Sequence, residues 1–118
     1  MDSILTSIKK LLGISAEYKN FDADIIMHIN TVFMTLKQLG VGPINGFRIE
    51  DDSTDWEEFI SIEDNPEMVT LLSAVKSYIH LKVKLLFDPP LSSAVMEAIK
   101  QSINELEWRL NAEAESKQ

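Results

Sequence analysis

The side chains that most often bind metals or transfer protons are few in this sequence. Its two histidines, His28 and His80, fall inside separate predicted helices, and neither has a second metal ligand four residues further on. A zinc site on a helix needs such a pair on one face. We therefore interpret both histidines as partly buried or surface residues rather than as ligands.

The densest group of carboxylates is the run Asp51-Asp52-Ser53-Thr54-Asp55. Calcium loops also gather carboxylates, but they alternate their oxygen ligands around a central glycine and close with a glutamate in register. This run lacks those features, so a solvated acidic loop is favoured. Glu105 and Glu107 are two positions apart, which on a helix directs them to different faces. The sequence predicts no metal and no cofactor.

Patterns for nucleophilic and phosphate chemistry are also missing. The chain has no cysteine, which removes disulfides, thiolate catalysis and cysteine metal sites together. It has no glycine-rich phosphate loop and no serine elbow, and its sequence singles out no Ser/His/Asp arrangement. We predict that this protein is not an enzyme.

Composition and charge narrow the class further. The chain has 118 residues, 45% of them hydrophobic and 25% charged, with a net charge of −8. These values fit one globular domain, residues 1–118. Nucleic-acid binders usually carry the opposite charge, so we expect no specific grip on DNA. An acidic surface past which DNA slides, or acidity that serves solubility alone, are both compatible with this charge.

Neither an export signal nor a membrane span is expected. The first residues lack the basic start and long apolar run of a signal peptide. No stretch approaches about 20 uninterrupted apolar residues. We therefore expect synthesis in the cytoplasm of the cell that makes the protein, and no contact with a membrane.

The first third of the chain predicts two amphipathic helices, over residues 3–12 and 22–39. Asp2 or Ser3 is suited to cap the first and Asp22 the second. A glycine follows each predicted end, as helix C-termini favour.

Residues 41–65 differ from the helices on either side. Two glycines and a proline precede Phe47-Arg48-Ile49, a candidate short strand, and the acidic run follows. Ser53 or Thr54 is suited to cap one helical turn that carries Trp56. We predict an inserted structured loop with room for a short β-hairpin, and loops of this length are usually functional or mobile.

The third predicted helix begins with Asn65 as N-cap and Pro66 as first residue, and runs to about Phe87. Its apolar residues cover more than one face, so it should be central, with neighbours on both flanks. Asp88-Pro89-Pro90 stops it.

The last predicted helix is capped by Ser92 or Ser93 and runs to about Asn111, before a polar tail, residues 112–118, that would fray unless something holds it. Apolar residues spaced three and four apart make a narrow seam: Met96, Ile99, Ile103, Leu106 and Leu110. The fold class is therefore mainly α, a compact bundle of about four helices with a long loop between the second and third.

Trp108 lies roughly opposite that seam, because each helical residue turns by about 100°. It shares the outward face with Gln101, Asn104 and Glu105. One interpretation is that Trp108, with Arg109 beside it, packs on another subunit, since tryptophan is enriched at interfaces. The other is that the indole lies over aliphatic stems or under the acidic loop. For Trp56, a local cluster with its apolar neighbours is slightly favoured.

The order of these elements resembles the head–tail connector proteins, also called adaptor or head-completion proteins, of siphovirus-type phages. The resemblance covers nearly the whole chain. It rests on these motifs, in chain order: Leu11-Leu12-Gly13-Ile14, Gln38-Leu39-Gly40-Val41-Gly42, Phe87-Asp88-Pro89-Pro90 after a tyrosine-bearing helix, Ser92-Ser93, and Glu107-Trp108-Arg109-Leu110.

The resemblance implies a structural protein of the virion, located at the head–tail interface. It implies a homo-oligomeric ring, usually of twelve copies, that docks under the portal protein, extends the DNA channel and receives a stopper or tail protein. The implied subunit or portal interface comprises Gln101, Asn104, Glu105, Trp108, Arg109 and Asn111. The implied channel or neighbour-subunit loop comprises Phe47, Arg48, Asp51, Asp52, Asp55 and Trp56. The alternative is a helical adaptor that engages one protein partner without forming a ring.

Overall fold

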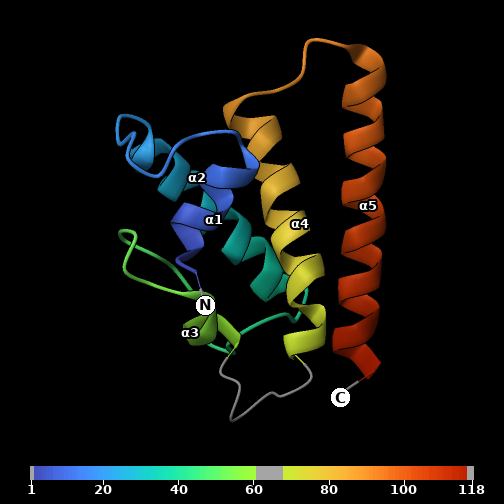
Figure 1. The fold of residues 1–118 in the computed structure, drawn as a ribbon. Coiled ribbons are helices and arrows are strands. Elements are labelled where there is room, and N and C mark those ends of the chain that lie inside the picture. Colours follow the sequence, from blue (N-terminus) through green and yellow to red (C-terminus); the bar gives the residue numbers. More distant parts are fainter. Residues whose placement is uncertain (1, 61–67, 117–118) are drawn as a thin grey trace.

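Five helices form the structure, a computed structural model that describes residues 2–60 and 68–116. They are α1 (Ile4–Leu11), α2 (Asp22–Gln38), α3 (Trp56–Ile60), α4 (Met68–Phe87) and α5 (Ser93–Ser116) (Figure 1). Four are long or of moderate length, and α3 is the single turn expected inside the loop. The mainly α fold class is confirmed.

The start of α1 is capped as expected, by Ser3, whose Oγ accepts a hydrogen bond from the Thr6 N–H at 3.1 Å. The prediction for α2 is wrong. Phe21 occupies its N-cap position without a side-chain hydrogen bond, and Asp22 is the first helical residue. The Asp22 carboxylate instead forms an ion pair with Lys9 of α1, so it joins two helices rather than capping one.

The loop between α2 and α3 forms no strand within residues 41–60, so the expected hairpin is absent there. The Asn30 amide takes the place of a partner strand. Its Nδ2 donates to the Ile49 carbonyl at 2.9 Å, and its Oδ1 accepts from the Ile49 N–H at 2.8 Å. The extended segment is thereby fixed by a side chain of α2, and Ile49 is buried.

The cap of α3 is Asp55 rather than Ser53 or Thr54. Asp55 Oδ1 accepts from the Glu58 N–H at 3.1 Å, because the turn starts one residue later than predicted. Ser53 bonds back to Asp51, and the Thr54 carbonyl accepts from the Ile4 N–H at 2.9 Å. The loop is therefore tied to the start of α1.

Helix α4 is central, as its broad apolar surface predicted, because it contacts α1, α2, α3 and α5. Its buried residues are Leu72, Val75, Tyr78, Ile79 and Val83. The predicted N-cap Asn65 and first residue Pro66 lie outside the described residues. Asp88 and the two prolines end the helix where expected.

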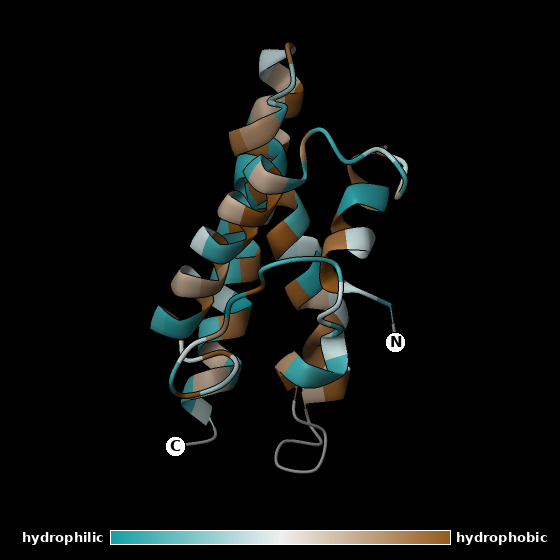
Figure 2. Ribbon diagram, turned by 90° about the vertical axis from the view of Figure 1, so that its left-hand side faces the viewer, coloured by the Kyte–Doolittle hydropathy of each residue, from teal (hydrophilic) through white to brown (hydrophobic). Residues whose placement is uncertain are grey.

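Helix α5 lies along α4 at one side of the molecule (Figure 1). Ile103 and Leu110 are buried in the interface with α4, and Ile99 and Leu106 are partly buried beside them. This confirms the narrow seam for four of its five predicted residues, and Met96 is half-buried outside this core cluster. Figure 2 shows how hydrophobic and hydrophilic residues alternate along the helices, while the loops that face the viewer are largely hydrophilic.

The C-terminal end of α5 extends to Ser116, further than the predicted end near Asn111. The Asn111 side chain donates to the Leu39 carbonyl at 3.2 Å. Ala114 packs so closely on Gly40 that a Cβ there would lie 3.1 Å from Ala114 Cβ. Contacts with the end of α2 therefore keep residues 112–116 helical.

Candidate functional site

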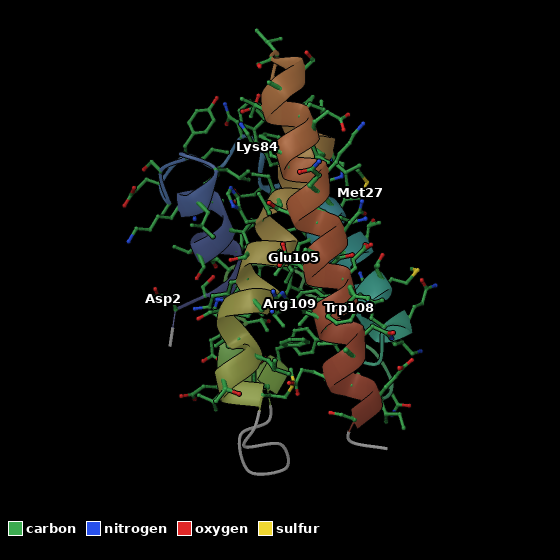
Figure 3. All side chains as sticks on the ribbon, turned by 90° about the vertical axis from the view of Figure 1, so that its right-hand side faces the viewer. Asp2, Met27, Lys84, Glu105, Trp108 and Arg109 are labelled. Carbon is green, nitrogen blue, oxygen red and sulfur yellow. The ribbon has the colours of Figure 1, made fainter. Side chains whose placement is uncertain are left out.

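Trp108 is the most exposed aromatic side chain in the described part of the chain, with 71% of its surface open to solvent. Figure 3 shows it on the outer side of α5, near Glu105 and Arg109. Neither the acidic loop nor neighbouring aliphatic stems cover the indole. A large apolar ring held open on a regular helix is typical of an interaction surface.

The other residues predicted around Trp108 divide into two groups. Gln101, Asn104, Glu105 and Arg109 are exposed, and Arg109 forms an ion pair with Glu105 at 2.8 Å. Asn111 is half-buried by its hydrogen bond to the end of α2, so its side chain holds α5 in place. We name the outer strip around Trp108, which runs from Glu97 to Glu115, the α5 face.

Two residues predicted for the loop surface belong to the core. Trp56 is fully buried, and its Nε1 donates to Ser7 Oγ at 3.1 Å. Phe47 is partly buried, with its ring centroid 5.2 Å from that of Phe33 and 5.4 Å from that of Phe59. Trp56 therefore has no surface to offer a channel or a neighbouring subunit. The local cluster is the correct interpretation for this residue.

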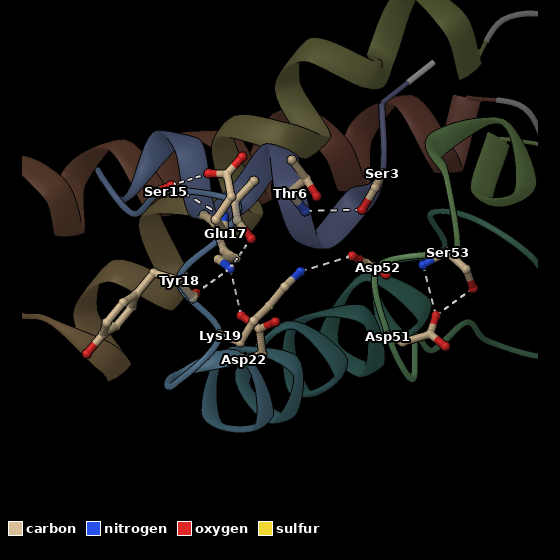
Figure 4. Close-up of polar contacts among 12 residues, drawn as sticks. Ser3, Thr6, Ser15, Glu17, Tyr18, Lys19, Asp22, Asp51, Asp52 and Ser53 are labelled. Atoms are coloured by element: carbon tan, nitrogen blue, oxygen red, sulfur yellow. Dashed lines mark hydrogen bonds and ion pairs between the residues drawn. The ribbon is translucent and has the colours of Figure 1, made fainter.

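The acidic residues of the loop are held in a defined turn (Figure 4). Asp51 Oδ1 accepts hydrogen bonds from the backbone N–H and the hydroxyl of Ser53, and these bonds hold the pKa of Asp51 below its usual range. Asp52 pairs with Lys19 at 3.3 Å. Asp51 thus presents a negative charge to solvent, the charge of Asp52 is offset by Lys19, and Asp55 serves as the α3 cap.

A groove that the sequence did not predict lies between α2 and the loop at 45–48. Its volume is about 820 Å³. Met27 and Met34, 58% and 63% exposed, line it together with Lys37 and Arg48. The signal was present in the sequence, because methionines seven residues apart share one helix face, away from the buried stripe of α2.

Within residues 2–60 and 68–116, no group of three or more His, Asp or Glu side chains could hold a metal ion. Burial and the nearby Lys84 charge lower the pKa of His80, against the effect of its hydrogen bond to the Leu11 backbone. His80 is therefore a neutral packing residue at pH 7.

None of the described helices is both long enough and apolar enough to cross a membrane. Exposed apolar side chains occur on several elements, among them Trp108 on α5, Met27 and Met34 in the groove beside α2, and Ile44 and Leu91 in connections.

Comparison with known proteins agrees with this picture. The family model for phage connector proteins matches residues 4–117, a segment that includes all five helices. Neither the curated proteins nor the solved structures gave a match. The match over nearly the whole chain shows that this protein belongs to the phage connector protein family.

Proposed function

We propose that this protein forms the ring that docks under the portal, joins the phage head to the tail and extends the DNA channel. Family membership indicates a structural role at the head–tail junction, and hence a place in the virion. The proposal specifies that the ring has twelve copies and binds the portal on one side. It also specifies that the ring binds a stopper or tail protein. Synthesis in the host cytoplasm is a further part of it.

The observation that carries the proposal is the exposure of Trp108 on a helix that packs from one side only. Among the helices, α5 contacts chiefly α4, so its opposite side is free for another protein. Tryptophan supplies large, rigid contact area and is frequent among the residues that dominate binding. The side chains of the proposed subunit or portal interface are Gln101, Asn104, Glu105, Trp108 and Arg109, with Asn111 positioning the helix.

Closing a ring requires two different surfaces on each subunit that meet head to tail. The described residues provide several separated surfaces, among them the α5 face, the α2 groove and the acidic loop. This arrangement supports a ring better than a symmetric dimer, which would use a single self-complementary surface.

The acidic loop is the part we assign to the channel. The carboxylates of Asp51 and Asp52 are both exposed. Asp51 is fixed in a turn by Ser53 and Asp52 is paired with Lys19, so Asp51 carries the charge that would face passing DNA with little freedom to rearrange. Repulsion between carboxylates and phosphates opposes sticking. DNA would then pass without specific binding.

The second candidate function is a helical adaptor that engages one protein partner and forms no ring. The α2 groove favours it, because a groove lined by methionines together with Lys37 and Arg48 can accept one segment of a partner. This candidate predicts a monomer or dimer that binds through the groove alone.

Electron microscopy of the protein mixed with the portal protein of the same phage tests the proposal. The expected result is a cylindrical density added beneath the portal, with the symmetry of a closed ring. Particles that show neither a ring nor any portal complex would overturn it. A one-to-one complex without a ring would support the adaptor instead.

A further inference from the structure

The α2 groove combines apolar and basic chemistry on an acidic protein. Met27 and Met34 are two helical turns apart on one side of α2, and both are more than half exposed. The loop at 45–48 forms the opposite wall. Methionine adapts its shape to a partner and contacts aromatic rings favourably through sulfur.

The charge of the groove is opposite to that of the chain as a whole. Lys37 and Arg48 line it, and no carboxylate does. Neither cation forms an ion pair within the described residues. With a net charge of −8, two unpaired cations beside an apolar floor favour an occupant that brings an aromatic or apolar group flanked by carboxylates.

The α5 face has this chemistry. Glu97, Glu105 and Glu115 lie within about 60° of Trp108 around the helix axis, since each residue turns by about 100°. All four side chains are exposed, and Glu105 is paired with Arg109, which leaves Glu97 and Glu115 as carboxylates without an ion pair among the described residues. An indole flanked by these glutamates matches a groove lined by Met27, Met34, Lys37 and Arg48. Sulfur–aromatic and cation–π contacts are then available to the ring.

We infer that the α2 groove of one copy receives the α5 face of a second copy. The inference rests on the proposed function and assigns the ring contact within it. Figure 3 shows Trp108 on α5, and Met27 belongs to α2, so the two surfaces lie on different helices. Because the surfaces are different, each copy can give one and receive the other, as a head-to-tail contact requires.

Charge also decides against the other pairing between copies. If the α5 face met the acidic loop, Glu97 and Glu115 would approach Asp51, and like charges in contact oppose association. The groove is the complementary surface. On this assignment the α5 face is a contact between copies, and the portal binds another surface.

Cross-linking between two single-cysteine chains tests the inference, because the natural chain has no cysteine. Thr31→Cys places a thiol in the groove between the two methionines, and Asn104→Cys places one beside Trp108. The two chains, which carry different mass tags, are assembled together on the portal and treated with a short bismaleimide. The expected product is the mixed dimer, with at least about tenfold more of it than of either homodimer.

Two controls separate a specific contact from random collision. Leu91→Cys, at a fully exposed position in the connection between α4 and α5 and not among the residues that line the groove, replaces Thr31→Cys in one reaction. Arg48→Glu in the groove chain should reduce the mixed dimer severalfold, whereas Lys10→Glu, an equal charge change at an exposed position of α1, should leave it unchanged.

The outcomes distinguish this inference from the proposed function. Rings on the portal that give no mixed dimer, or no more of it than the Leu91→Cys control, would overturn the inference alone. Cross-links from Asn104→Cys to the portal would do the same. If neither rings nor a portal complex form, the proposed function fails, and the inference fails with it.

Discussion

Lys9 Nζ lies 2.8 Å from Asp22 Oδ1, and the Lys9 side chain is only 2% exposed. The same nitrogen donates to the backbone carbonyls of Tyr18 at 2.7 Å and Ala16 at 3.2 Å. One buried cation therefore joins the end of α1, the connection at 12–21 and the start of α2. Since nothing else in the described core is charged and buried, we expect this contact to fix the angle between the two helices.

Replacing the buried cation should destabilise the protein strongly. Lys9→Met removes the charge and leaves the Asp22 carboxylate and two carbonyls without their partner, which should lower the free energy of unfolding by about 3 kcal/mol. Urea unfolding followed by circular dichroism measures this. Lys10→Met, at the exposed neighbouring position, should change stability by less than about 0.5 kcal/mol. Equal effects of the two substitutions would contradict the prediction.

The stability of the fold should decrease at alkaline pH, because of a hydrogen bond between α4 and α5. The Tyr78 hydroxyl donates to Glu107 Oε2 at 2.5 Å, and burial together with this carboxylate raises the pKa of Tyr78 well above its usual value of 10.0. A raised pKa in the folded state means that the stabilising effect is complete below pH 10 and is lost as pH rises above it. The limiting slope is about 1.4 kcal/mol per pH unit.

Tyr78→Phe provides the control for this pH dependence. It should lower stability at pH 7 by about 2 kcal/mol, because a hydrogen bond to a charged acceptor is lost. It should also flatten the decline between pH 10 and 11. Lysines lose their charge in the same range, so the comparison with Tyr78→Phe isolates the tyrosine. Identical pH profiles for the two proteins would show that Tyr78 makes no contribution.

Two glycines with positive φ offer a matched pair. Gly42 has a φ of +94°, and a Cβ there would lie 2.5 Å from Phe59 Cε2, whereas Gly13, with a φ of +81°, has nothing within 4 Å. Both alanine substitutions cost about 1 kcal/mol of backbone strain. Gly42→Ala should cost about 1–3 kcal/mol more, because the aromatic cluster must shift. Thermal unfolding of both variants checks the difference, and equal melting temperatures would contradict it.

Charge reversal in the acidic loop tests the channel assignment. Asp51→Lys with Asp52→Lys should slow DNA ejection severalfold, because cations on the lining attract phosphates. Asp55 is left unchanged because it caps α3. Asp2→Lys with Glu113→Lys gives the same change in net charge at exposed positions elsewhere. Ejection measured from assembled particles should be slowed by the first pair alone, and an unchanged rate for that pair would remove the loop from the channel.

The helices could be predicted because local signals determine them. Glycines, prolines and apolar spacing gave the order of elements, the central place of α4 and the seam of α5. The outward position of Trp108 followed from helix geometry alone. These features depend on residues close together in the sequence, so spacing is sufficient to predict them.

The missed features depend on residues far apart in the sequence. The local sequence predicts Asp22 as a cap, but its carboxylate pairs with Lys9 of α1. Residues 47–49 were expected to pair with another strand, but the Asn30 side chain forms the hydrogen bonds to Ile49 instead. The sequence places Ala114 in a polar tail. Its helical position could not be predicted, because the residue on which it packs, Gly40, lies far away in the sequence, just after α2. The α2 groove was missed because its second wall is a loop whose path no local pattern specifies.

The amide of Asn30 has a consequence for how this protein avoids misassembly. An extended segment with free backbone groups invites a strand from another chain to pair with it, which leads to aggregation. Here both backbone groups of Ile49 are already bonded to one side chain. No foreign strand can pair at this residue, so copies of the protein can crowd together while this part of the loop stays closed to β-sheet addition.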